Sequence, residues 1–311
     1  MRITVLGAGG IGLYFAAMLA RAGHRVTVVG RPHTVAAAAN PLILERDSAQ
    51  VEVPGIRAVA DVAGDEGPAD LVIVGVKAWQ VPAAAAAVAP IVGPQTAVLP
   101  LQNGVEAAAD LAAVLGAECV VGCSCVVIAQ RVAPWAVRCL GADAAVEIGA
   151  LTTESEDRVA KVAAVLAEAG IAVTRSVDIE ATLWRKLMLI ASYGGVGAIA
   201  RQPVGVTRDE PETAGLVHAA MREVLVVARA RGIALDEGDV ARMMEVYRGF
   251  SPDTTSSMQR DLAAGRPSEL DCQSGAVVRF GRAAGVRTPI HHTIYAAQLP
   301  AETAARTGRT P

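Results

Sequence analysis

The chain has 311 residues, of which 52% are hydrophobic and 19% are charged, and its formal net charge is -3. This length accommodates two packed domains with separate apolar cores, and the composition is typical of a compact enzyme rather than a disordered chain. The slightly acidic balance provides no basic field that could hold a phosphate backbone, so we expect no nucleic-acid partner.

The apolar segments are short and are interrupted by Gly, Pro or charged residues before the roughly 18 residues that a membrane span requires. Glycines at positions 7, 9, 10 and 12 punctuate the N-terminal apolar stretch, which argues against a signal peptide. The five cysteines lack the paired spacing and nearby histidines of a zinc site, so we expect reduced, packed thiols and no metal. The sequence therefore predicts a cytoplasmic protein without a membrane segment.

The first half alternates short β-branched runs with alanine-rich helical stretches. A helix is expected over 154–170, and strands are expected at 3–6, 26–29, 71–74, 96–99, 120–121 with 126–128, 145–148 and 171–174. Continuous apolar strands separated by helices predict a parallel sheet that is covered on both faces. The expected fold class is therefore α/β, with a doubly wound Rossmann sheet at the N-terminus.

The pattern becomes helical after about residue 178. Pro211 and Pro267 are placed as residues that begin helices, Gly232 as one that follows a helix end, and the tail after Pro300 is expected to fray. Helices are expected over 179–192, 211–232, 236–249, 253–264 and 267–284. We therefore predict two domains, a Rossmann domain over 1–177 and an all-helical domain over 178–311.

A glycine-rich motif lies between the first strand and the first helix. Its spacing is G-x-G-x-x-G, and it consists of Gly7, Ala8, Gly9, Gly10, Ile11 and Gly12. The first glycine permits a tight turn, the second lets the backbone approach a pyrophosphate, and the third lets helix and strand pack closely. Because the helix N-terminus also attracts anions, these six residues are candidate dinucleotide ligands, although a glycine turn without a ligand is the alternative.

The end of the second strand carries Gly30 and Arg31, where an NAD-binding protein usually has Asp or Glu for the ribose hydroxyls. A guanidinium there can clamp a 2′-phosphate with paired, charge-assisted hydrogen bonds. The sequence therefore favours NADPH as the cofactor. The alternative is that Arg31 is a solvated loop cation.

Lys77 and Asn103 each follow an apolar run directly, which places them at the carboxyl ends of parallel strands. Ligands bind at that edge of an open α/β sheet, so both residues are candidates for the cofactor site. The Asn103 amide could bind the nicotinamide or the reacting carbonyl. A solvated lysine and an Asx-type turn are the structural alternatives.

Taken together, these residues resemble the ketopantoate reductase family, 2-dehydropantoate 2-reductases. The resemblance rests on the glycine motif, Arg31, Val76-Lys77, Gln102-Asn103-Gly104, Trp184-Arg185-Lys186, Glu223-Val224, Ser256-Ser257-Met258 and Ser268-Glu269-Leu270-Asp271. It implies NADPH-dependent reduction of a 2-keto acid. It also implies a C-terminal all-helical domain like that of 6-phosphogluconate dehydrogenase.

The resemblance also implies roles for residues of the helical half. Lys186, on an apolar helix, matches the family's general acid, and a partly buried ammonium is suited to stabilise and protonate the alkoxide formed as hydride arrives. Ser257 matches a substrate-binding serine, and Glu269 matches a glutamate at the cofactor ribose or substrate edge that we count among the catalytic candidates with Asn103. Asp261 and Glu223 are weaker candidates, because the sequence alone is equally consistent with ordinary surface charges at both positions.

The family usually has two asparagines four and eight residues after this lysine, whereas this chain has Ile190 and Gly194. Both positions are counted with the substrate pocket, and neither retains a side-chain hydrogen-bonding group. A specialised substrate, either another carbonyl compound or an imine, is therefore an alternative to ketopantoate. A non-catalytic NADP(H)-binding protein and a dehydrogenase running toward oxidation also remain open, as does a homodimer.

Overall fold

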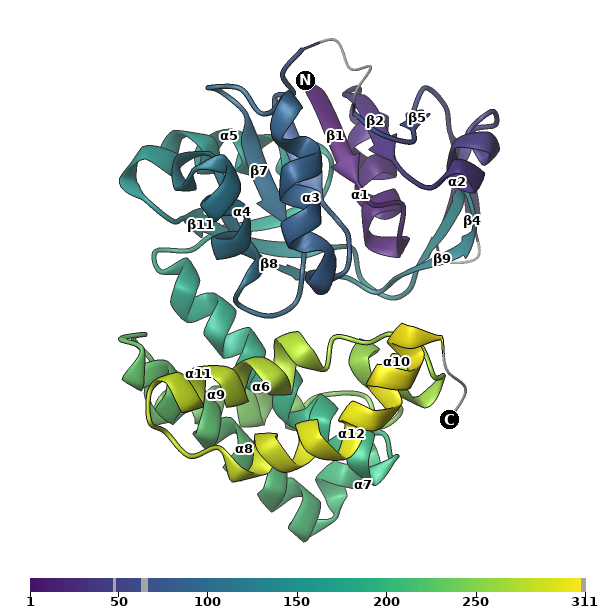
Figure 1. The fold of residues 1–311 in the computed structure, drawn as a ribbon. Coiled ribbons are helices and arrows are strands. Elements are labelled where there is room, and N and C mark those ends of the chain that lie inside the picture. Colours follow the sequence, from purple (N-terminus) through teal and green to yellow (C-terminus); the bar gives the residue numbers. More distant parts are fainter. Residues whose placement is uncertain (47–48, 63–66, 309–311) are drawn as a thin grey trace. The chain divides into compact units, whose positions relative to one another are not determined.

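The computed structural model describes residues 1–46, 49–62 and 67–308. Internal contacts divide the chain into two compact units (Figure 1). The first comprises Met1–Gln102 and Glu106–Ile179, and the second comprises Asn103–Val105 and Glu180–Pro311. Nothing in the sequence pattern indicates that residues 103–105 belong to the second unit.

The first unit contains a five-stranded parallel sheet with the order β5-β2-β1-β6-β7. Its strands are β1 (Arg2–Leu6), β2 (Arg25–Val29), β5 (Arg57–Val59), β6 (Leu71–Val74) and β7 (Ala97–Pro100). Alternate side chains of each strand point to opposite faces, and both faces are buried. The predicted doubly covered parallel sheet is therefore confirmed.

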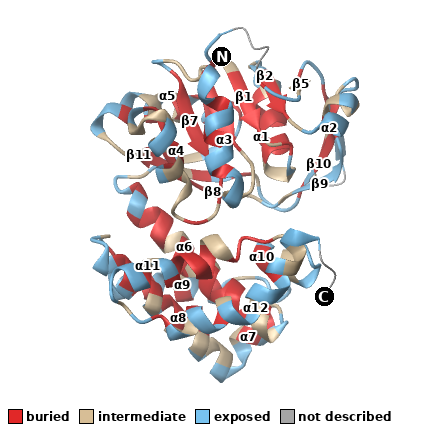
Figure 2. Cartoon of the chain, viewed as in Figure 1, coloured by how far each residue is buried: buried red, intermediate tan, exposed pale blue. Residues whose placement is uncertain are grey.

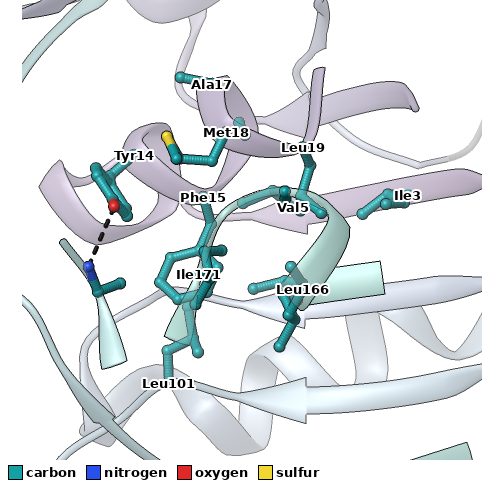
Figure 3. Packing of buried hydrophobic residues seen from close by; sticks show 14 of the residues in the cluster. Ile3, Val5, Tyr14, Phe15, Ala17, Met18, Leu19, Leu101, Leu166 and Ile171 are labelled. Atoms are coloured by element: carbon teal, nitrogen blue, oxygen red, sulfur yellow. Dashed lines mark hydrogen bonds between the residues drawn. The ribbon is translucent and has the colours of Figure 1, made fainter. Parts of the chain in front are cut away.

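One face of this sheet packs against α1 (Gly10–Arg21) and α5 (Glu156–Glu168). In Figure 3, aromatic and aliphatic side chains of α1 lie over Ile3 and Val5 of β1, together with Leu166 and Ile171. The hydroxyl of Tyr14 accepts a hydrogen bond from the backbone N–H of Ala144 at 3.1 Å (Figure 3). This polar contact holds α1 in place within the apolar core. Residues of α3 (Val81–Val88) and α4 (Ala107–Leu115) join the apolar cluster on the other face.

Two smaller sheets complete the first unit. In the first, β11 (Ala145–Ala150) pairs in parallel with β12 (Ala172–Arg175) but antiparallel with β8 (Val121–Val126), so the expectation of parallel strands throughout was wrong here. The second has the order β4-β3-β10-β9, and the sequence analysis did not predict it. Its strands are β3 (Leu42–Arg46), β4 (Ala49–Val53), β9 (Ala129–Ala133) and β10 (Ala136–Cys139), and a short helix, α2 (Pro32–Ala37), precedes them.

The second unit is helical, as predicted. Its elements are α6 (Ile179–Ala200), α7 (Val204–Asp209), α8 (Pro211–Ala230), α9 (Glu237–Arg248), α10 (Ser257–Ala263), a π-helical turn (Asp271–Gly275) that continues into α11 (Ala276–Ala283), and α12 (Pro289–Thr307). Buried residues concentrate along α6, which supplies much of this core (Figure 2).

Several predicted helix boundaries were wrong. α6 continues eight residues past 192, because its glycines allow neighbouring side chains to pack directly on the helix backbone, as Ile294 does at Gly195. α10 begins at 257 rather than 253, because the Ser256 hydroxyl caps it by accepting the N–H of Gln259 at 3.0 Å. The helix expected from 267 begins at 271. Of the tail that was expected to fray after Pro300, residues 301–307 form the last part of α12, and residues 309–311 lie outside the described residues.

No helix in the ranges 1–46, 49–62 and 67–308 is both long and apolar enough to cross a membrane. All five cysteines are free thiols, and four of them are buried.

Candidate active site

The glycine turn is built by close backbone packing. Gly7 has φ +106°, and a Cβ atom there would lie 2.9 Å from the backbone of Gly75. A Cβ atom on Gly12 would lie 1.9 Å from the carbonyl oxygen of Gly7. These glycines are therefore required by the fold itself, because they bring the ends of β1 and β6 against the start of α1.

Gly9 is different, because the protein around it does not require a glycine. It is exposed, and a Cβ atom there would meet nothing nearer than the Gly75 carbonyl oxygen at 3.9 Å. Gly9 is also the residue before α1, so the free N–H groups of the first helical turn lie just after it. The missing side chain leaves room for a ligand rather than for another part of the chain.

The other members of the motif face the protein. Ala8 is buried, Ile11 packs against the core, and a Cβ atom on Gly10 would lie 2.2 Å from the carbonyl oxygen of Ala129 in β9. After β1 the chain continues to β2, toward one edge of the sheet, and after β6 it continues to β7, toward the other edge. The turn therefore lies at the topological switch point, where open α/β sheets bind ligands.

Arg31 lies beyond the end of β2, directly before α2, and it is exposed. Its neighbour Gly30 is held by a hydrogen bond from its N–H to the Val59 carbonyl, at 2.9 Å. This strand end therefore presents the guanidinium of Arg31. An exposed cation in this position suits a phosphate ligand.

Lys77 follows β6 and is half-buried. The Gln80 side chain accepts its backbone N–H at 3.2 Å, and its ammonium lies 5.9 Å from the centre of the Trp79 ring. Gln102 follows β7, and its Nε2 donates to the carbonyl oxygens of Val74 and Val76, both at 2.8 Å. In the sequence Gln102 stands out only as part of a motif, but in the structure its side chain ties the ends of these two strands together.

Two candidates from distant parts of the sequence meet in the second unit. Nδ2 of Asn103 donates a hydrogen bond to Oε2 of the buried Glu269 at 2.9 Å. Gly104 has φ +97°, and a Cβ atom there would lie 2.9 Å from the carbonyl oxygen of Cys272. The loop therefore packs directly on the π-helical turn that follows Glu269.

Lys186 is half-buried on α6, and its two preceding neighbours fix the helix in place. Trp184 packs on the Phe280 ring with centroids 5.6 Å apart, and Arg185 donates to the buried carboxylate of Asp239 at 2.9 Å. Ile190 lies one turn further along and is also half-buried. The residue that follows Lys186 by one turn on the same face is therefore apolar.

Gly194, one turn beyond Ile190, is fully enclosed. A Cβ atom there would lie 2.6 Å from Oγ of Ser256, the residue that caps α10. In the sequence Gly194 is a position without the polar side chain that is usual in the family, and in the structure Ser256 occupies the adjacent space. A polar side chain at 194 would require Ser256 to move.

Of the three remaining candidates, Asp261 and Glu223 bind other parts of the protein. Ser257 is exposed as the first residue of α10, and Asp261 binds Arg266 across the end of that helix at 2.9 Å. The Glu223 carboxylate accepts the N–H groups of Ile290 and His291 at the start of α12, at 2.8 and 3.0 Å. Burial raises the pKa of Glu223. These contacts show Asp261 and Glu223 stabilising helix ends.

Two family models match the chain. Residues 3–153 match the model described as Ketopantoate reductase PanE/ApbA, and residues 178–299 match the model of its C-terminal domain. The chain is 33% identical over 291 residues to the 2-dehydropantoate 2-reductase of Mycobacterium tuberculosis, covering 93% of each chain. It is 31% identical over 296 residues to that of Caulobacter vibrioides, covering 94% of this chain and 97% of the relative.

The fold is also found in a solved structure. A PanE/ApbA family ketopantoate reductase from Ralstonia eutropha has a TM-score of 0.88 and 34% identity, covering 98% of this chain and 100% of that one. The matches span both units, and they contain the glycine turn, Lys186 and Glu269. The chain belongs to the ketopantoate reductase family and is an oxidoreductase.

Proposed function

We propose that this oxidoreductase reduces a 2-keto acid with NADPH, forming the 2-hydroxy acid. The observation that carries the proposal is the turn at Gly9, which is exposed, lies at the switch point of a parallel sheet, and has a glycine that internal packing does not need. The relatives named 2-dehydropantoate 2-reductase make ketopantoate the first substrate to test.

The residues present suit a phosphorylated dinucleotide. The N–H groups at the start of α1 would hold the pyrophosphate, and the Arg31 guanidinium would hold the 2′-phosphate. Lys77 and Asn103 are the remaining candidates for this cofactor site. When bound, NADPH supplies the hydride.

The chain's own groups would handle the proton and the orientation of the substrate. The carbonyl oxygen gains negative charge as its carbon gains hydride, and the Lys186 ammonium would stabilise that charge and then donate a proton from Nζ. Asn103 and Glu269 would act as a pair, because the carboxylate fixes which way the amide points. Ser257 at the start of α10 would bind the substrate.

A second candidate is a different carbonyl compound or an imine. It is favoured by the apolar Ile190 one turn after Lys186, and by Ser256 filling the space at Gly194. Neither position can supply the side-chain hydrogen bond that a hydroxyl of ketopantoate would accept or donate. Each such bond contributes roughly 0.5–1.5 kcal/mol, so the loss of two would noticeably weaken ketopantoate binding.

The experiment is a turnover assay with NADPH against ketopantoate, 2-keto acids with larger apolar groups, ketones and imines. Lys186→Ala should keep NADPH affinity and lose turnover, whereas Lys161→Ala, on α5, should keep both. Fast turnover of ketopantoate alone would reject the specialised substrate. Tight NADPH binding with no turnover on any compound would reject the enzyme and favour a non-catalytic NADP(H)-binding protein.

A further inference from the structure

The segment between α10 and the π-helical turn has no regular secondary structure, yet its last three residues, 268–270, are buried. Ser268 and Leu270 are 0% exposed and Glu269 is 7% exposed. Buried backbone N–H and C=O groups need hydrogen-bond partners, and a segment outside helices and strands must find them elsewhere. The partners of Ser268 come from the last two turns of α12.

Glu302 and Arg306, four residues apart on α12, bind every polar group of Ser268. The Glu302 carboxylate accepts the Ser268 N–H at 2.9 Å and its hydroxyl at 2.6 Å. Arg306 donates to the Ser268 carbonyl oxygen at 3.1 Å and also pairs with the Glu302 carboxylate. Glu302 is only 2% exposed, so its charge depends on these partners.

These contacts hold Ser268, the residue directly before Glu269. The Ser268 hydroxyl also accepts the N–H of Leu270 at 3.2 Å, so the backbone is held on both sides of Glu269. The Glu269 side chain then meets the Asn103 amide at 2.9 Å. Because both peptide groups that flank Glu269 are fixed, its carboxylate has a defined position relative to that amide.

We propose that Glu302 is a positioning residue, which holds Ser268 so that Glu269 presents its carboxylate to Asn103. This inference rests on the proposed function, because it assigns Glu302 an effect on turnover that acts through Glu269. The alternative is that Glu302 only stabilises the end of the chain. The two differ in whether the effect of Glu302 on turnover requires Glu269.

The first experiment measures amide hydrogen exchange in the full chain without any ligand. In Glu302→Gln the peptide containing residues 266–270 should exchange about 10-fold to 100-fold faster, because a charge-assisted hydrogen bond is lost. Glu245→Gln, which breaks an exposed ion pair with Arg248 on α9, is the matched control and should leave that peptide unchanged. Unchanged exchange in Glu302→Gln would overturn the proposal, whatever the substrate.

The second experiment is a double-mutant cycle on kcat. Glu302→Gln should lower kcat about 10-fold or more, since small displacements of active-site groups cost up to about 100-fold. In a Glu269→Gln background the same change should have almost no further effect on kcat. Equal losses in both backgrounds, or no loss in either, would show a purely structural role.

Two further comparisons keep these outcomes separate. If Glu302→Gln does not fold, Ser268→Ala removes only the hydroxyl contacts and should show the same dependence on Glu269. A wild-type chain without turnover on any carbonyl or imine would overturn the proposed function and the catalytic part of this inference. The exchange experiment would still decide whether Glu302 holds Ser268.

Discussion

The side-chain amide of Asn103 donates a 2.9 Å hydrogen bond to the carboxylate of Glu269, a residue 166 positions later in the chain. A carboxylate only accepts hydrogen bonds, so the Asn103 amide must turn its NH₂ toward Glu269 and its carbonyl oxygen elsewhere. Glu269 thereby fixes the orientation of the remaining donor and acceptor of the Asn103 amide.

Asn103→Asp should disrupt this pair, because it sets two carboxylates beside one another. We expect a loss of about 1–3 kcal/mol in the free energy of unfolding and a fall in kcat of about 100-fold. Glu269→Gln in the same chain restores a donor and an acceptor with their positions exchanged. Urea unfolding should show recovered stability in that double variant, and a double variant no more stable than Asn103→Asp alone would contradict the contact.

Alanine substitutions at Gly9 and Gly12 should separate ligand binding from folding. At Gly9 the new methyl group has space, so stability should fall by at most about 1 kcal/mol while the dissociation constant for NADPH rises. At Gly12 the methyl group collides with the Gly7 carbonyl, which should cost about 3 kcal/mol or more. Thermal unfolding and NADPH fluorescence titration measure the two effects. Unaltered NADPH affinity in Gly9→Ala would rule out this turn as the pyrophosphate site.

Arg31→Ala should raise the KM for NADPH about 10-fold to 100-fold and leave the KM for NADH nearly unchanged, because only NADPH carries the 2′-phosphate. Arg25→Ala is the matched control. It removes an exposed arginine from the opposite end of the same strand and should alter neither KM value. Equal effects of Arg31→Ala on both cofactors would contradict the assignment of NADPH.

Gly194→Ala should destabilise the helical unit, because the added carbon would lie 2.6 Å from the Ser256 hydroxyl oxygen. The expected cost is about 1–3 kcal/mol. Ser256→Gly keeps an acceptable residue before α10 and should cost only a few tenths of a kcal/mol, and combining it with Gly194→Ala should recover most of the loss. Strictly additive losses by urea unfolding would mean that the two positions do not share this space.

We expect His291 to make the free energy of unfolding depend on pH. Burial lowers the pKa of His291 to about 4, and its ring lies between Ser274 and the Ala220 carbonyl oxygen. The unfolded chain takes up a proton below about pH 6.5 and the folded chain does not, so stability falls between pH 6.5 and 4 by up to about 3 kcal/mol. No further loss from this group occurs below pH 4, where both states are protonated.

His291→Gln should therefore flatten the curve of unfolding free energy against pH across this window. The exposed His218, changed to Gln on α8, is the control and should leave the slope as in the wild type. Urea unfolding at pH 7 and pH 4.5 measures the difference. An unchanged slope in His291→Gln would show that other groups cause it.

Much of the fold could be predicted, because its strongest signals are local. Each strand is indicated by a short apolar run, at 3–6, 26–29 and 71–74, and the glycine turn directly joins the first of them to the start of a helix. The direction of β8 against β11 could not be predicted, since a strand has the same residue pattern in either direction. No part of α12 was among the predicted helices, and its end, which was expected to fray, is stabilised by a tertiary contact of Glu302 with Ser268.

The sequence indicated candidates for the site one by one, but it could not show which of them lie in contact. Asn103 and Glu269 were singled out for separate reasons, and nothing in their spacing indicates a shared hydrogen bond. The sequence could not show that Ser256, 62 positions later, lies beside Gly194. The sequence alone cannot distinguish Asp261 and Glu223 from functional carboxylates. Their hydrogen-bond and ion-pair partners in the structure place both residues at helix ends.

The contribution of Asn103–Val105 to the helical unit has a practical consequence for dissecting the protein. A fragment that begins at residue 180 would contain every helix of that unit but lack the amide donor of Glu269, as well as the apolar side chain of Val105. A buried carboxylate without its donor is costly, so such a fragment should be less stable than the same helices in the intact chain. Expression of the two halves as independent proteins therefore cannot be assumed to preserve either the fold of the second half or its chemistry.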